Sequence, residues 1–159
     1  MADAEQTTDA DEQLSRMQLG RLADPDPRVR ELAADEAGDQ LRRRGLDQKV
    51  VETAVARLVE ASLVEQDGRA LESALNACSD AASVFELPLP IVEPLTSLAP
   101  RLPCGLIGYV VQILASTHDP KARTAIAAYA DHPDLELRRA TDDALIELAG
   151  RQASWRSPK

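Results

Sequence analysis

The sequence predicts an all-α fold, and three observations lead to that prediction. Apolar residues recur at the three- and four-residue spacing of an amphipathic helix, whereas the alternation typical of strands is nearly absent. Aspartates, often followed by proline, stand where several of these runs begin, as expected of helix N-caps. The chain has 159 residues, of which 44% are hydrophobic. This length suits one domain with a sizeable buried core.

Spacing and turn residues predict eight helices, arranged as four hairpins. We expect them over residues 13–23, 27–43, 47–65, 69–83, 90–99, 103–116, 120–130 and 135–149.

The first four helices have clear boundary signals. Asp24-Pro25-Asp26-Pro27 ends the first helix, and Asp26 is expected to cap the second. Three arginines, 42–44, lie in the last turn of that helix, where positive charge is favourable near the negative end of the helix dipole. Gly45 is expected to end the helix in a left-handed conformation. The third helix carries one continuous apolar stripe, and Asp67-Gly68 predicts the turn before the fourth. The second helix is expected to bury Val29, Leu32, Ala33, Ala37 and Leu41.

In the second half, prolines shape the boundaries. Pro88 and Pro90 lead into the fifth helix, where Pro94 indicates either a first turn or a kink. The sixth helix is apolar on nearly every side, as expected of a central helix. Asp119-Pro120 and Asp134 predict the starts of the last two helices, and Gly150 predicts the end of the eighth.

Charge is distributed unevenly along the chain, whose formal net charge is −9. Residues 1–12 hold five acids and no base, and we interpret them as an acidic disordered tail. Residues 151–159 hold three bases and no acid, which indicates a basic flexible tail; Trp155 in it fits a free residue or a docking anchor equally well. The repeat domain between them, 13–150, also carries an excess of acid.

Residues 84–117 are poor in charge and rich in large apolar side chains. The composition fits either the centre of the fold or a surface covered by another protein. The centre of the fold is the favoured interpretation.

Two stretches of the chain match each other. Asp26-Pro27-Arg28-Val29-Arg30 aligns with Asp134-Leu135-Glu136-Leu137-Arg138 at a shift of 108 residues. Three steps of about 36 residues fall in the range of helical-hairpin arrays. The two units between keep the helix pairs but lose the motif.

The run 24–33 resembles the start of the second helix of a HEAT repeat, and 131–148 resembles a weaker copy. This resemblance implies a short α-solenoid of about four HEAT-like hairpins, a family that most often binds proteins. It implies structural roles for the turn aspartates Asp26 and Asp134. It likewise implies intra-repeat hydrogen bonds for Arg30 and Arg138. It does not imply an enzyme.

No catalytic, cofactor or metal site is predicted. Gly105-x-x-Gly108 lies within an apolar helix, where close helix packing is a better interpretation than a phosphate loop. His118 and His132 stand beside turns and are expected to be solvated. Cys78 and Cys104 lack nearby histidine partners and are expected to be buried thiols.

The leading functional hypothesis is a non-enzymatic protein-binding module that binds a basic partner with an acidic face. Six acids occupy corresponding positions of the second and eighth helices and are candidates for one edge of that face: Asp35, Glu36, Asp39, Asp142, Asp143 and Glu147. Their adjacent pairs are interpreted as solvated surface rather than acid–base catalysts, because no cleft residues accompany them. An immunity-type inhibitor of a basic toxin or nuclease fits this charge.

The alternative is an adaptor or assembly subunit that associates through residues 84–117, with itself or another chain, so a monomer or a weak homodimer is expected. Nucleic acid is disfavoured as a partner by the acidic balance and by Phe85, Tyr109 and Tyr129, which are expected in the core. No signal peptide or membrane span is recognisable, and two cysteines suggest no disulfide framework. A cytoplasmic protein is therefore expected.

Overall fold

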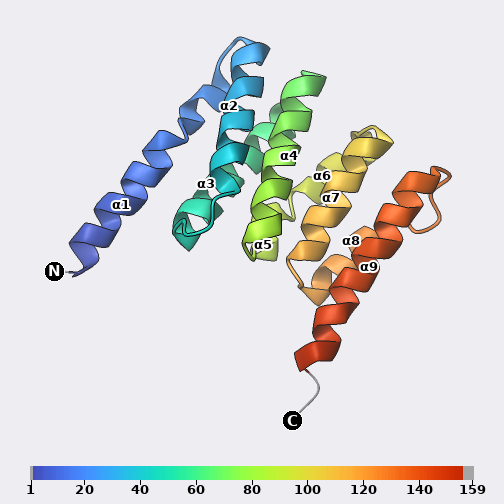
Figure 1. Ribbon diagram of the computed structural model, residues 1–159. Coiled ribbons are helices and arrows are strands. Elements are labelled where there is room, and N and C mark those ends of the chain that lie inside the picture. The colour runs from blue at the N-terminus through green and yellow to red at the C-terminus, as the bar shows by residue number, and fades with distance from the viewer. Residues whose placement is uncertain (1, 156–159) are drawn as a thin grey trace. The chain divides into compact units, whose positions relative to one another are not determined.

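The computed structural model describes the backbone of residues 2–155 and the side chains of residues 9–150. It divides into two compact units, Met1–Phe85 and Glu86–Lys159, and each is described by itself. All regular elements in the described backbone are helical, which confirms the predicted all-α class (Figure 1).

In its described backbone, unit 1 contains four α-helices of 15 to 17 residues and one short 3₁₀ helix. The elements are α1 (Ala2–Arg16), the 3₁₀ helix η1 (Leu19–Ala23), α2 (Pro27–Leu41), α3 (Gln48–Val64) and α4 (Gly68–Val84). An aspartate side chain caps the N-terminus of α2, α3 and α4: Asp26, Asp47 and Asp67 accept hydrogen bonds from the following backbone amides. Gly45 has the expected left-handed conformation, with φ of 92°. It lies beyond the end of α2, because the helix already ends at Leu41.

The N-terminal segment differs from the expected disordered tail over 1–12 and helix over 13–23. One helix, α1, takes in residues 2–16, and Gln18, with φ of 48°, separates it from η1. The segment is rich in Ala, Glu and Gln, which are good helix formers. Glu12 and Arg16 add an ion pair of 3.2 Å at helical spacing.

The core of unit 1 lies where α4 packs along α2 and against α3 (Figure 1). Small side chains of α2, among them Ala33, Ala34 and Ala37, are fully buried there. Leu32 was expected among them, but it is 49% exposed, so this prediction is wrong. Because small residues allow α2 to approach its neighbours closely, the buried side of the helix extends over these alanines and excludes Leu32.

Unit 2 contains two long helices and several short ones. The elements are α5 (Leu89–Val92), α6 (Leu95–Leu98), η2 (Ala99–Arg101), α7 (Cys104–Ser116), η3 (Pro120–Ala122), α8 (Arg123–Ala127) and α9 (Leu135–Trp155). The helix expected over 90–99 is broken, because Pro94 has no amide proton to donate and interrupts the helix between α5 and α6. The helix expected over 120–130 begins as a 3₁₀ turn and ends at Ala127.

The C-terminal helix is longer than expected. α9 continues past Gly150 to Trp155, so Gly150 lies inside the helix and does not end it. Residues 151–155, expected as part of a flexible tail, belong to α9. The rest of that expected tail, 156–159, lies outside the described residues.

The charge-poor stretch 84–117 forms much of the core of unit 2, as the favoured interpretation predicted. Its buried apolar side chains include Val92, Leu95, Val110, Val111, Ile113 and Leu114. Phe85, Tyr109 and Tyr129 were expected in the core but are only half-buried, as is Cys104. Throughout the described backbone, the helices are too short or too polar to cross a bilayer.

Candidate functional site

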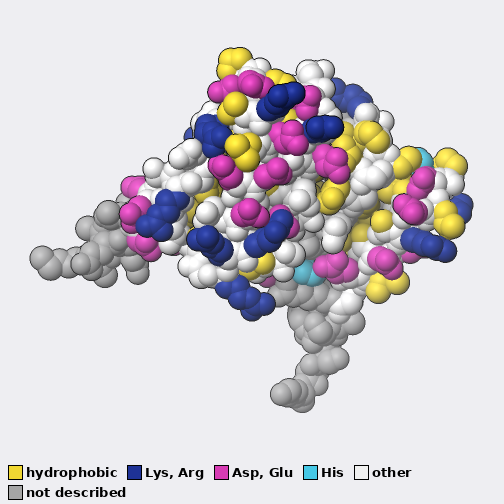
Figure 2. Space-filling model, turned by 45° about the horizontal axis from the view of Figure 1, so that its top comes forward, with side chains coloured by type: hydrophobic (Ala, Val, Ile, Leu, Met, Phe, Trp, Pro, Cys, Tyr) yellow, Lys and Arg dark blue, Asp and Glu magenta, His cyan; other side chains and the backbone are white. Residues whose placement is uncertain are grey.

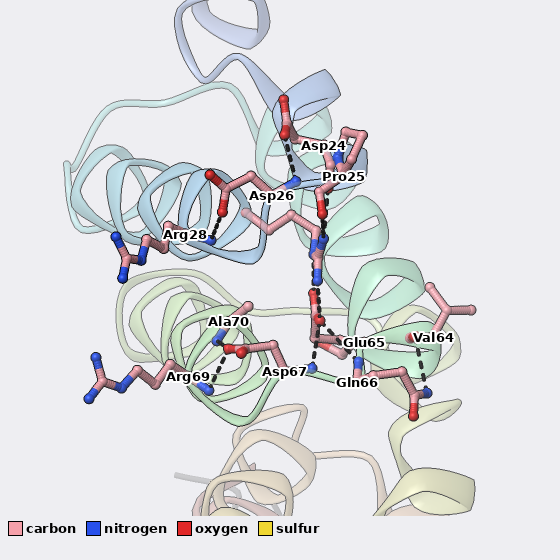
Figure 3. Close-up of polar contacts among 12 residues, drawn as sticks. Asp24, Pro25, Asp26, Arg28, Val64, Glu65, Gln66, Asp67, Arg69 and Ala70 are labelled. Atoms are coloured by element: carbon pink, nitrogen blue, oxygen red, sulfur yellow. Dashed lines mark hydrogen bonds and ion pairs between the residues drawn. The ribbon is translucent and has the colours of Figure 1, made fainter.

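The Asp-Pro-Asp-Pro turn before α2 is a set of nested caps (Figure 3). The amide of Asp26 donates to Asp24 Oδ1 at 2.8 Å, and the amide of Arg28 donates to Asp26 Oδ1 at 2.9 Å. Pro27 occupies the first helical turn, where its missing amide proton costs little. The turn therefore stabilises the N-terminus of α2.

Arg30 ties this turn to the one between α3 and α4. Its Nε and Nη2 donate to the two carboxylate oxygens of Glu65 at 2.7 and 2.9 Å. Its Nη1 donates to the carbonyl oxygens of Asp24 and Pro25 at 2.7 and 3.1 Å. The Glu65 carboxylate also accepts from the amides of Gln66 and Asp67, and its side chain is only 6% exposed.

The chemistry of this pair favours both charged forms. Hydrogen bonding from Arg30 holds the pKa of Glu65 below its ordinary value, although partial burial acts in the opposite direction. The same hydrogen bond raises the pKa of Arg30. An arginine held in this way by the fold is a structural group, and we assign it no ligand.

The copy of the turn at 131–138 keeps the caps but not the arginine contacts. Asp134 Oδ1 accepts from the amide of Leu137 at 2.8 Å. His132 takes the position of Asp24, since its Nδ1 accepts from the amide of Asp134 at 3.1 Å, and it is half-buried rather than solvated.

Arg138 was expected to hydrogen-bond within its repeat, and this expectation is wrong for the described residues. Its half-buried side chain forms no hydrogen bond or ion pair with any of them. Arg30 finds Glu65 at the turn inside the following hairpin. In the described backbone no further hairpin follows α9.

All six candidate acids are exposed, and the structure assigns three to each unit. Asp35, Glu36 and Asp39 lie on α2, and Asp142, Asp143 and Glu147 lie on α9. Over the face in view in Figure 2, acidic side chains lie among arginine and lysine side chains. A carboxylate that already pairs with a cationic side chain of the same chain is less available to a partner than an unpaired one. The pairing of each carboxylate is therefore more informative than the number of carboxylates.

In unit 1, two of the three candidate acids of α2, Glu36 and Asp39, have arginine partners within the unit. Arg21 Nη1 lies 2.7 Å from Glu36 Oε2. Arg42 lies between two helices, with Nη1 3.4 Å from Asp39 Oδ1 and Nη2 3.1 Å from Asp80 Oδ2. We call the surface where α2 meets α4 the α2–α4 seam. A cavity of about 140 Å³ on it is lined by Ala34, Asp35, Gly38, Asp39, Arg42, Ser73, Asn76, Ala77 and Asp80.

Gly38 lets the α2–α4 seam close. A Cβ at this position would lie 3.0 Å from Asp80 Oδ2 and 3.3 Å from the Cα and Cβ of Ala77. Only a residue without a side chain fits between the two helices without displacing a neighbour.

Unit 2 has a larger depression between its two long helices, which we call the α7–α9 groove. Its volume is about 360 Å³, and it is lined by Gly105, Gly108, Tyr109, Gln112, Ala140, Asp143, Ala144 and Glu147. No neighbouring heavy atom lies within 4 Å of the position that a Cβ of Gly105 or Gly108 would take. The prediction that these glycines permit close helix packing is therefore wrong, because they leave space open.

Two of the predicted acids, Asp143 and Glu147, lie on the wall of this groove one helical turn apart. Among the residues whose side chains the structure describes, no lysine or arginine lines the groove. The Nε2 of His118 lies 3.7 Å from Glu147 Oε1. Asp142 is exposed on α9 but does not line the groove.

Sequence reasoning missed Tyr109 and Gln112 as groove residues. The signal was present, because positions 105, 108, 109 and 112 fall on one side of a helix. What makes that side a groove is the partner helix α9, which begins only at Leu135, and spacing within α7 does not reveal it.

No cluster of three or more His, Cys, Asp or Glu among the described side chains is placed to hold a metal ion. Burial raises the pKa of the Cys78 thiol to about 12, so this cysteine is a packing residue.

Comparisons of this chain with known protein families, with curated proteins and with solved structures found no match. The α7–α9 groove therefore stands as the candidate site on its geometry alone.

Proposed function

We propose that this chain is a non-enzymatic protein-binding module, a short solenoid of HEAT-like hairpins that binds a basic protein partner through acidic surface. The observation that carries the proposal is the pair Asp143 and Glu147. Both are exposed, both line one groove, and no arginine or lysine with a described side chain lines that groove with them.

The surrounding charge supports the same partner chemistry. Residues 86–150 contain nine acids and five bases, and the whole chain has a formal net charge of −9. An acidic surface of this kind accelerates encounter with a basic partner and discriminates against acidic ones. A basic toxin or nuclease, held inactive by the module, is the partner class that we favour.

The packing within each unit supports the repeat architecture. α2 packs along α4 in unit 1, and α7 packs along α9 in unit 2 (Figure 1). Each of these is the second helix of an expected hairpin. Direct packing of second helices on one another is what stacked hairpins require.

Burial argues against the alternative of an adaptor that associates through 84–117. The large apolar residues of that stretch are mostly buried within unit 2. Four large apolar side chains in the described part of the chain are well exposed, and all lie outside the stretch: Leu32, Val64, Leu135 and Ile146. We therefore keep the acidic-surface proposal as the main one.

The test is capture of partners from an extract of the native host at two salt concentrations, about 50 mM and about 500 mM, followed by mass spectrometry. We expect a basic protein that is retained at low salt and lost at high salt. The double variant Asp143→Asn/Glu147→Gln should lose it. The matched variant Glu93→Gln/Asp131→Asn removes the same charge from exposed positions of unit 2 and should retain it. Equal capture at both salt concentrations would contradict the proposal.

A further inference from the structure

We infer that the α7–α9 groove receives an arginine side chain presented by the basic protein partner. This inference rests on the proposed function and specifies the occupant of its site.

The shape of the groove suits one long side chain. Gly105, Gly108, Ala140 and Ala144 contribute almost no side-chain bulk to it. Its volume of about 360 Å³ lies at the lower end of the range for sites that bind small groups. A flat acidic patch would attract a basic protein without selecting any part of it, whereas a groove admits a side chain and excludes the backbone that bears it.

The lining groups match a guanidinium. Asp143 and Glu147 supply carboxylates that accept charge-assisted hydrogen bonds, and the amide oxygen of Gln112 is a further acceptor. Tyr109 supplies an aromatic ring to the lining. A planar guanidinium stacks on such a ring and binds carboxylates in a fork, while its aliphatic stem packs on small apolar residues. An ammonium group makes these contacts less well.

The chain itself contains an example of this arrangement in unit 1. The guanidinium of Arg42 lies between Asp39 and Asp80 on the α2–α4 seam, at 3.4 and 3.1 Å. A space between two long helices with carboxylates on its walls thus accommodates an arginine there. The α7–α9 groove has the carboxylates, but within residues 9–150 no arginine lines it.

The experiment is an NMR titration of the isotopically labelled full chain with a blocked tripeptide that carries one arginine between two glycines. The same tripeptide with lysine is titrated in parallel. We expect the arginine peptide to bind with a Kd on the order of 1 mM, with shift changes concentrated at Gly105, Gly108 and Ala144. The lysine peptide should bind at least about threefold more weakly.

A variant that fills the groove without changing charge separates shape from electrostatics. Gly108→Leu places a side chain in open space on a helix that tolerates leucine well. It should weaken arginine-peptide binding by about tenfold or more. Gly105→Leu serves as a second filling variant. Gly68→Leu, at an open and exposed position of unit 1, is the matched control and should bind as the wild type does.

Shift changes scattered over exposed carboxylates, or unchanged binding by both filling variants, would overturn the inference. So would equal affinity for the lysine peptide. Failure here is distinguishable from failure of the proposed function. If the inference alone is wrong, host-protein capture stays salt-dependent and sensitive to Asp143→Asn/Glu147→Gln, but Gly108→Leu leaves it intact. If the proposed function is wrong, capture shows no salt dependence at all.

Discussion

The α2–α4 seam and the α7–α9 groove are both places where two long helices lie side by side, and glycine does opposite things in them. Gly38 lies so close to α4 that an added Cβ would come within 3.0 Å of Asp80. Gly105 and Gly108 face open space. Glycine therefore permits close contact between the helices of one pair and leaves space between the helices of the other. The difference lies in the distance to the neighbouring helix.

The two places also differ in how their carboxylates are neutralised. In unit 1, arginines 21, 30 and 42 each lie against an acid of the same unit. In the α7–α9 groove, no arginine or lysine of the described side chains lines the space beside Asp143 and Glu147. The acids paired with these arginines serve the fold of unit 1, whereas Asp143 and Glu147 are the acids that we propose to meet a partner.

The largest expected effect comes from filling the closed seam. Gly38→Leu forces a side chain against Ala77 and Asp80 and should lower the free energy of unfolding by about 3 kcal/mol. Urea denaturation followed by circular dichroism measures it. Gly108→Leu makes the same exchange in the open groove and should leave stability unchanged or slightly higher. Equal losses in the two variants would remove the distinction between seam and groove.

A smaller loss is expected on cutting the link between the two turns of unit 1. Glu65→Ala removes the acceptor of two Arg30 hydrogen bonds and of the amides of Gln66 and Asp67. It should cost about 2 kcal/mol in urea denaturation. Glu60→Ala, at an exposed position of α3, is the matched control and should change stability by less than about 0.5 kcal/mol. A Glu65 variant as stable as this control would show that the link contributes nothing.

The same link predicts a pH dependence with a definite sign. The pKa of Glu65 is lower in the folded chain than its ordinary value of 4.5. The contribution of ionised Glu65 to the free energy of unfolding is therefore fully present above the ordinary pKa. It is lost as the pH falls through the pKa of the folded state. The stability difference between wild type and Glu65→Gln should be largest at neutral pH and should shrink below about pH 4.5. Urea curves at a series of pH values check this, and a difference that stays constant down to pH 3 would be the contrary result.

The smallest effect is expected in the groove, and it has the opposite sign. Asp143 and Glu147 are like charges one turn apart on α9. Asp143→Asn/Glu147→Gln removes this repulsion and should therefore raise the free energy of unfolding by about 0.3 kcal/mol in low salt. Loss of the contact between His118 and Glu147 offsets part of this gain. Thermal unfolding at low and high salt measures it. A clear loss of stability would mean that these carboxylates serve the fold rather than a partner.

Local features of the fold were predictable from the sequence. Asp26 and Asp134 cap helices as predicted, because a cap depends on residues only two or three positions away. The centre of unit 2 was predictable from the charge-poor stretch 84–117, since so many apolar side chains have to be buried together.

Features that depend on distant residues were not predictable. Arg30 finds Glu65 35 positions away, and no local pattern distinguishes it from Arg138, which has no such contact in the described residues. Leu32 has the right spacing for burial but lies outside the contact that the alanines of α2 make. The acids of the candidate site were identifiable by residue type. The groove was not, because predicting it requires the distance between α7 and α9.

The most direct test of the account compares how soluble paramagnetic probes reach the glycine Hα protons on the two helix pairs. A cationic nitroxide and a neutral one of similar size are added in turn, and the relaxation of Gly38, Gly105 and Gly108 is measured by NMR. An open acidic groove predicts strong relaxation of Gly105 and Gly108, stronger with the cationic probe and reduced by salt, while Gly38 stays protected. Equal relaxation of all three glycines, or no preference between the probes at the groove, would contradict it.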